Sequence, residues 1–284
     1  MGYNAAYDRG EERRNLMADL KELTILIRGA GEMASGVAHR LWRCRFKLLL
    51  TEIPTPLAVR RAVSFCEAVH DGTKTVEGAT AQRVESLEEA GEAWRRDLIP
   101  VLVDPEMSCL AELRPQVLVE ASLHKRNDFG LRADLTPLVI ALGPGFRAPA
   151  EADYVIETNR GHNLARVIEE GPAEPDTGQP GSIEGLTWQR VLRAPAEGVF
   201  RAEHTIGDLV EKGQAVAQVA GSPVLAGTGG MIRGLIRPGT LVREGLKVGD
   251  VDPRGKRALP ANISEKARAL SGSVLECILR TFNT

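Results

Sequence analysis

The chain lacks a surplus of charge of either sign and lacks any long apolar run. Its 284 residues hold 36 Lys and Arg against 38 Asp and Glu, which gives a net charge of −2. General nucleic-acid binders need a basic surplus to neutralise phosphates, so this balance argues against a nucleic-acid partner. No apolar run approaches the ~20 residues of a membrane-spanning helix, so the sequence predicts no membrane partner.

Close pairs of cysteines are also missing. The four cysteines, Cys44, Cys66, Cys109 and Cys277, are far apart and form no Cys-x-x-Cys pair. Such spacing is typical of the reduced cytosol and supplies no zinc framework, and buried thiols are the default expectation. The charged start of the chain has no apolar core of a secretory signal. We therefore expect a cytoplasmic protein without a metal site.

What the sequence does contain is a regular alternation of short apolar runs and helical patterns up to about position 170. Near-continuous apolar strands that alternate with helices predict a parallel sheet covered on both faces, here an α/β fold of the Rossmann-like type. Strands are expected at 23–28, 47–52, 75–84, 99–103, 117–121, 138–142 and 154–157, and helices at 57–70, 87–96 and 161–169.

The amino-acid composition of the chain changes after position 170, where Gly, Pro and Asp are frequent. Such stretches mark domain boundaries. We expect an N-terminal tail (1–20), a Rossmann-like nucleotide-binding domain (21–170), a linker (171–187), a small β domain (188–257) and a C-terminal helix (258–284). Asn262 and Glu265 resemble a capping box at the start of that helix.

The β domain contains an internal repeat with a constant offset. The matched positions are Gly198 with Gly230, Gly207 with Gly239, Val210 with Val242, Gly213 with Gly245, Val216 with Val248 and Val219 with Val251. Two such half-repeats predict a barrel-sandwich-like fold, as in biotinyl and lipoyl carriers. The hairpin tip at 220–224 has no Lys for cofactor attachment, so we expect a structural or interface module. Asp208, Asp250 and Asp252 are expected in turns.

A glycine-rich loop follows the first expected strand and opens a helix. Gly29 permits the tight turn, Gly31 lets the backbone approach a diphosphate, and Ala34 takes the close-packing position. Glu52 ends the second strand, where an acid bonds a ribose hydroxyl. This combination predicts binding of NAD or a related nucleotide. The alternative is a Rossmann fold that has lost its nucleotide.

Polar side chains cluster just after two later strands. His124, Lys125 and Arg126 follow one strand, whereas Asn159, Arg160 and His162 follow another. Loops at the carboxyl ends of parallel strands converge on one edge, so these residues are candidates for binding a substrate or an anion. The glycines of 143–146 are expected to bring backbone close to the ligand. Arg60 and Arg61 are expected on a solvated helix face.

Long strings of the chain resemble YqeB-type selenium-dependent molybdenum hydroxylase system proteins, and the Rossmann part also resembles the XdhC family. The strings are RGAGEMASGVAHR (28–40), TEIP (51–54), AVRRAVSFCEAV (58–69), IALGPGF (140–146), VIETNRGHNL (155–164) and KVGDVDPR (247–254). The resemblance implies an accessory factor in the maturation of molybdenum hydroxylases, with the molybdopterin cofactor as ligand or cargo. It implies no catalytic residues.

Three functions therefore remain open from the sequence. The first is a maturation factor that handles a phosphate-bearing small molecule for a molybdenum hydroxylase partner. The second is an NAD-dependent oxidoreductase that uses His124, Lys125 or His162 as general acid. The third is a non-enzymatic nucleotide-sensing scaffold whose β domain docks a partner. A homo-oligomer is compatible with all three.

Overall fold

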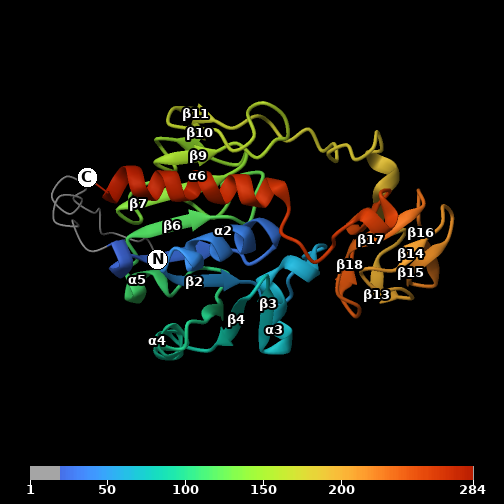
Figure 1. Cartoon of the computed structure of the whole chain (residues 1–284), viewed down its shortest axis with the longest axis horizontal. Coiled ribbons are helices and arrows are strands. Elements are labelled where there is room, and N and C mark those ends of the chain that lie inside the picture. Colours follow the sequence, from blue (N-terminus) through green and yellow to red (C-terminus); the bar gives the residue numbers. More distant parts are fainter. Residues whose placement is uncertain (1–19, 284) are drawn as a thin grey trace. The chain divides into compact units, whose positions relative to one another are not determined.

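The computed structural model describes residues 20–283, and the chain divides into two compact units (Figure 1). The tail expected at 1–20 lies outside the described residues except for Leu20, which begins a short 3-10 helix, Leu20–Glu22. The first unit holds residues 20–54, 65–176 and 263–283 of the described chain. The second unit holds Thr55–Ser64 and Thr177–Asn262.

A nine-stranded mixed sheet forms the centre of the first unit, in the order β10-β9-β7-β6-β1-β2-β5-β4-β3. The seven inner strands run parallel, and β10 and β3 pair antiparallel at the two edges. The expected strands are confirmed except at 75–84, where the chain forms two antiparallel strands, β3 and β4, joined by a turn at 77–78. Their bounds are β1 Thr24–Arg28, β2 Lys47–Glu52, β3 Thr73–Val76, β4 Ala79–Val84, β5 Ile99–Val103, β6 Val117–Glu120, β7 Leu138–Leu142, β9 Tyr154–Ile156 and β10 Val167–Ile168. A separate short pair joins β8, Arg147–Ala148, to β11, Gly171–Pro172.

Two long helices, α2 (Glu32–Arg43) and α6 (Glu265–Phe282), lie side by side along the sheet (Figure 1). A Cβ on Gly36 of α2 would lie 2.7 Å from Cβ of Ala267, so the close approach of the helices requires glycine there. Shorter helices are α3 (Ala68–Asp71), α4 (Leu87–Arg95) and α5 (Leu110–Leu113). Among the described residues, no helix combines the length and apolar character needed to span a membrane.

The cap of α6 differs from the one expected. Ser264 is the N-cap, and its hydroxyl accepts the Ala267 N–H, whereas Asn262 lies two positions earlier. A serine at this position satisfies one of the free N–H groups of the first turn. The expected start of the helix was thus close, but the capping residue was wrong.

The helix expected at 57–70 is wrong as a continuous element. Only α3 and two 3-10 turns, Arg61–Val63 and Phe65–Glu67, form there. The Phe65 N–H donates to Ser35 Oγ at 2.7 Å and the Cys66 N–H donates to the Ala30 carbonyl at 2.8 Å. These tertiary hydrogen bonds replace the ones a helix would make.

The helix expected at 161–169 is also wrong. Turns lead there into β10, and Ala165 has a φ of 68°. The Ala165 N–H donates to the Glu157 carbonyl at 2.9 Å, and β10 then adds antiparallel to β9. The end of the segment 161–169 pairs as an edge strand, although its apolar residues have the spacing of a helix.

In the second unit, two four-stranded antiparallel sheets have the orders β12-β19-β17-β14 and β16-β15-β13-β18. A core of mostly aliphatic residues, with Phe200, lies between their strands. The strands are β12 Val191–Arg193, β13 Gly198–Ala202, β14 Leu209–Val210, β15 Ala215–Val219, β16 Ser222–Leu225, β17 Gly230–Leu235, β18 Leu241–Val242 and β19 Lys247–Asp252.

The internal repeat of the sequence recurs in the backbone of this unit. The strands β13, β14 and β15 begin at the positions that the repeat matches to the starts of β17, β18 and β19. Gly198 and Gly230 have nearly the same φ, 153° and 150°. The halves exchange their short strands, because β14 pairs with β17 and β18 pairs with β13. Each sheet therefore combines two long strands of one half with the short strand of the other.

Several charged residues of this unit are buried, contrary to the sequence expectation. Arg60 is 7% exposed and donates to the carbonyls of Pro260 and Asn262, and Arg61 donates to the Leu235 carbonyl, so neither lies on a solvated helix face. The spacing of charged residues along an expected helix does not indicate hydrogen bonds to carbonyl groups that are distant in the sequence.

Two of the three aspartates expected in turns lie elsewhere. Asp250 and Asp252 are buried in β19, and they pair with Arg190 and Arg254 respectively. A buried carboxylate needs such a partner, which explains their place in a strand. Asp208 does lie in a turn, where it accepts the Thr205 N–H at 2.8 Å.

Candidate functional site

The carboxyl ends of the central strands carry the candidate residues of the first unit. Backbone hydrogen bonds extend just beyond the strands: the Gly29 N–H donates to Thr51, and the Ala121 N–H donates to Arg28. The loops after β1, β2 and β6 are thereby held at one edge of the sheet. In open α/β sheets this edge is where ligands bind.

The glycine loop between β1 and α2 has two glycines in different situations. Gly29 has a φ of 95°, and a Cβ there would lie 3.2 Å from the Ser122 backbone, so the turn itself requires glycine. Gly31, the N-cap of α2, has an ordinary φ of −70° and open space around its Cβ position. Its lack of a side chain leaves the approach to the first turn of α2 clear. Ala34 is fully buried in that turn.

Glu52 closes the same loop from the end of β2. Its two carboxylate oxygens accept the N–H groups of Ala30 and Ile53, each at 2.8 Å. Burial raises the pKa of Glu52, while those two N–H groups and Arg28 act in the opposite direction. Each carboxylate oxygen has a further lone pair, so Glu52 retains capacity to accept a ligand hydroxyl.

A buried carboxylate lies directly opposite the end of β1. Glu120 of β6 is in register with Arg28 of β1, and Arg28 Nη1 donates to Glu120 Oε2 at 3.1 Å. The guanidinium of Arg28 lies 3.7 Å from the ring centroid of Phe129 and also donates to the Pro105 carbonyl. Fixed partners on three sides hold this arginine in place.

Glu120 also organises His124, one of the residues expected at the site. The Ser122 hydroxyl donates to Glu120 and lies within hydrogen-bond distance of His124 Nδ1. Because the hydroxyl gives its single proton to Glu120, it accepts the one on Nδ1. The hydrogen bonding and charge of Glu120 raise the pKa of His124, whose side chain is 39% exposed. The arrangement can hold a proton near neutral pH and pass it to a group at the edge.

A second group of cations lies at the start of α6. Lys125 pairs with Asp176, and Arg160 pairs with Glu265. Burial lowers the pKa of the half-buried Lys266, and the charges of Arg160 and Lys125 lower it further, whereas Glu32 of the first turn of α2 opposes them. The structure thus brings Lys125 and Arg160 into electrostatic range of a third cation beside the glycine loop.

The other expected residues are placed less closely. Asn159 donates to Glu174 at 2.7 Å and lies beside the buried Glu157. Arg126 and His162 are exposed and make no hydrogen bond or ion pair with any residue between 20 and 283.

The glycine run at 143–146 plays a different part from the one expected. A Cβ on Gly145 would lie 2.3 Å from the His124 carbonyl, and one on Gly143 would lie 3.1 Å from Thr158 Oγ1. These glycines bring backbone close to the neighbouring loops rather than to an open surface. They fix the position of the loop that carries His124.

Two of the cysteines of the first unit, Cys66 and Cys109, are not placed for thiol chemistry. Cys66 and Cys109 are buried, and burial together with Asp104 raises the pKa of Cys109 to about 12. A thiol with such a pKa is protonated at neutral pH and is a weak nucleophile. In the part of the chain described, no three His, Cys, Asp or Glu side chains are grouped to hold a metal.

Four residues of this region, Arg28, Glu120, Ser122 and Lys266, were not predicted from the sequence as site residues. Arg28 and Glu120 were detectable in principle, since each is a charged residue that ends an otherwise apolar strand. Their pairing depends on β1 and β6 being neighbours, which the sequence order of the strands does not reveal. Lys266 carried no signal, because nothing local shows where the start of α6 packs.

A relative of known sequence matches almost the whole chain. The chain is 48% identical over 255 residues to the uncharacterized protein YqeB of Escherichia coli (strain K12), a match that covers 90% of this chain and 47% of the relative. The chain therefore spans about half the length of that protein. No protein-family model matches it.

Solved structures give only distant likenesses. TcdA (CsdL) aligns with 51% of this chain and 63% of its own at 16% identity and a TM-score of 0.29. A succinylglutamate desuccinylase/aspartoacylase from Rhodobacter sphaeroides aligns with 81% of this chain and 85% of its own at 14% identity and a TM-score of 0.26. These scores are below 0.5, so the account of the fold rests on the strand order of the chain itself.

Proposed function

We propose that this chain, which belongs to the YqeB-type proteins, binds a phosphate-bearing ligand at the glycine loop. We further propose that it serves in the maturation of molybdenum hydroxylases. The ligand is NAD or a related nucleotide, or the molybdopterin cofactor as cargo. The partner is the molybdenum hydroxylase that receives the ligand or is regulated by it, inside the cytoplasm.

The open space at Gly31 is the observation that carries this proposal. It lies at the first turn of α2, and the backbone N–H groups and dipole at the start of a helix favour a phosphate. The carboxylate of Glu52, at the end of β2, accepts the N–H of Ala30 in the same loop. A ligand with a phosphate and a hydroxyl-bearing ring would meet both features at once.

The strand order supports a Rossmann-type assignment for the first unit. Six of the seven parallel strands, β1, β2, β5, β6, β7 and β9, numbered in chain order, are arranged as 3-2-1-4-5-6, and β4 adds parallel to β5 outside them. The switch point of that order is between β1 and β6, where Gly29 meets Ser122. For the second unit, the exchanged short strands of the two halves support a barrel-sandwich-like module that serves as an interface.

A second candidate function, an NAD-dependent oxidoreductase, is favoured by the hydrogen-bonded series Glu120, Ser122 and His124. An imidazole held by a buried carboxylate at the ligand edge is a candidate general acid. Under this alternative, His124 would protonate or deprotonate the substrate next to the nicotinamide. An absorbance change at 340 nm with candidate substrates would favour this alternative over a maturation factor.

The proposal is tested by purifying the protein from a host that makes the molybdenum cofactor and identifying the small molecule released on denaturation. We expect a nucleotide or a phosphorylated pterin, with loss of that molecule in the Gly31→Val variant. The tagged protein should also retain a molybdenum hydroxylase without turnover of its own. Release of no such molecule, with no hydroxylase retained, would contradict the proposal.

A further inference from the structure

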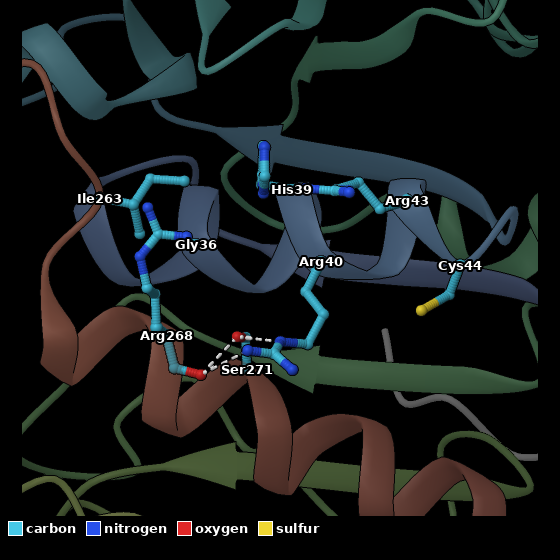
Figure 2. Close-up of a pocket in the computed structure, with 8 residues that line it drawn as sticks. All are labelled: Gly36, His39, Arg40, Arg43, Cys44, Ile263, Arg268 and Ser271. Atoms are coloured by element: carbon cyan, nitrogen blue, oxygen red, sulfur yellow. Dashed lines mark hydrogen bonds between the residues drawn. The ribbon is translucent and has the colours of Figure 1, made fainter.

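A cavity lies between α2 and the start of α6, and no residue of the glycine loop lines it. It has a volume of about 360 Å³ and is lined by α2 and by the segment from Ile263 to Ser271 (Figure 2). Gly36 forms part of its wall where the two helices approach each other. None of the candidate residues of the site described above lines it.

The lining of this cavity is basic. Arg40 and Arg43 come from successive turns of α2, Arg268 comes from α6, and His39 lies between them (Figure 2). Among residues 20–283, no Asp or Glu lines the cavity. Like charges gathered around a hollow raise the positive potential inside it, and such a potential attracts anions.

Two of the arginines are held in place. Arg40 donates from Nε to Ser271 Oγ at 2.7 Å and from Nη2 to the Arg268 carbonyl at 3.2 Å. Arg268 Nη2 donates to both carboxylate oxygens of Glu77 at 2.7 Å, which neutralises that one charge. Among residues 20–283 the hydrogen-bond partners of Arg40 are neutral, so no carboxylate of that range is bonded to it, and its position is fixed before any ligand arrives.

The third arginine is available to a ligand. Arg43 is exposed and makes no hydrogen bond or ion pair with the rest of the described chain, residues 20–283. We propose that the cavity between α2 and α6 is a second ligand site, which binds a small multivalent oxyanion through Arg40 and Arg43. Planar guanidinium groups match the oxygen geometry of phosphoryl and carboxylate groups alike.

The cavity contains its own reporter, because Cys44 lines it and is the exposed one of the four cysteines. Positive potential at Cys44 should favour alkylation by iodoacetate, an anion, over the neutral iodoacetamide. We expect the ratio of the two rates at low salt to be roughly tenfold above the ratio for glutathione. Pyrophosphate at matched ionic strength should also slow the reaction with iodoacetamide, because a bound oxyanion blocks the thiol.

Variants distinguish an effect of the cavity on the rate ratio from an effect of the overall charge of the protein. Arg43→Gln should lower the rate ratio about two- to threefold and weaken protection by pyrophosphate. Arg95→Gln, which removes an exposed arginine from α4, should change neither. Arg40→Gln should lower the ratio as well, but Arg43→Gln carries the test if loss of the Arg40 hydrogen bonds unfolds the protein.

Citrate, a carboxylate, is used in place of pyrophosphate to test whether the site binds carboxylate groups as well as phosphoryl groups. Protection by both supports a site for multivalent oxyanions in general, and protection by pyrophosphate alone supports the site and assigns it to phosphoryl groups. A rate ratio equal to that of glutathione would overturn the proposal. So would unchanged iodoacetamide labelling in the presence of both anions.

Discussion

The two units of the chain each contain a buried carboxylate that is bonded to arginine, but only one of these carboxylates reaches the surface through its partners. Asp250 in the second unit is flanked by Arg190 and Arg233, whose side chains are 7% and 13% exposed. Glu120 in the first unit is fully buried, yet it is linked to the exposed Ser122 and to His124. Both groups are carboxylate–arginine pairs, but the Glu120 group has exposed partners and the Asp250 group does not.

Access to solvent distinguishes the buried charges that belong to the fold from those that belong to a candidate site. The Asp250 cluster is closed, since Arg190 also donates to the Gly181 carbonyl at 2.7 Å. Removal of its carboxylate would leave buried guanidinium groups without a partner, which is a matter of folding. The Glu120 cluster ends at the carboxyl edge of the parallel strands, where it is open to solvent.

The largest effect is expected from breaking the closed cluster. Asp250→Ala leaves two arginines buried without their carboxylate, which should cost about 3–5 kcal/mol of the free energy of unfolding. Chemical denaturation measures this loss. Asp208→Ala, in an exposed turn of the same unit, is the matched control and should cost about 0.5–1.5 kcal/mol. Equal effects of the two substitutions would show that the Asp250 cluster is not structural.

A smaller effect, on binding alone, is expected at the open edge. Arg160→Ala and Lys125→Ala remove cations beside Lys266 and should weaken ligand binding by ~1.5–3 kcal/mol, or roughly ten- to a hundredfold. Their own ion pairs are exposed and contribute only about 0–1 kcal/mol, so the melting temperature should hardly change. If both variants bind like the parent, or both unfold, the cations are not part of the site.

The smallest effect concerns the protonation of His124. Glu120 raises the pKa of His124, so the stabilisation from its charged form is complete below its unfolded pKa of ~6.5 and is lost as the pH rises through the folded pKa. Glu120→Gln should return the pKa toward the unfolded value. Nuclear magnetic resonance of the imidazole measures this, with His124→Gln to assign the signal. An unchanged titration in the Glu120→Gln variant would remove Glu120 as the cause.

Much of the fold could be predicted from the sequence because the central strands are simple apolar runs. β5 and β7 begin and end at the residues expected, and the internal repeat of the β domain recurs in its strands. The segment 57–70 could not be predicted, because Thr55–Ser64 belongs to the second unit, where the Val59 carbonyl accepts the Leu235 N–H and Arg61 donates to the Leu235 carbonyl. Helical spacing alone does not reveal such long-range hydrogen bonds.

The candidate site was predictable only where a strand end marks it. The glycine loop, Glu52 and His124 follow apolar strands, so their place at one edge could be inferred from local sequence. Lys266 lies in α6, whose neighbour α2 is close to the opposite end of the sequence. The neighbour of a helix depends on packing of the whole unit, here on the contact of Gly36 with Ala267.

The most direct test of the central claim is calorimetry with NAD, NADP, FAD, ATP and cytidine nucleotides on the parent protein and on Gly31→Val. Gly31 has a φ open to any residue and no atom within 4 Å of its Cβ position, so valine should leave the fold intact while blocking the loop. The account predicts saturable binding of at least one nucleotide by the parent, and its loss in a variant that melts at the same temperature. Absence of binding by the parent, or equal binding by a folded Gly31→Val protein, would contradict it.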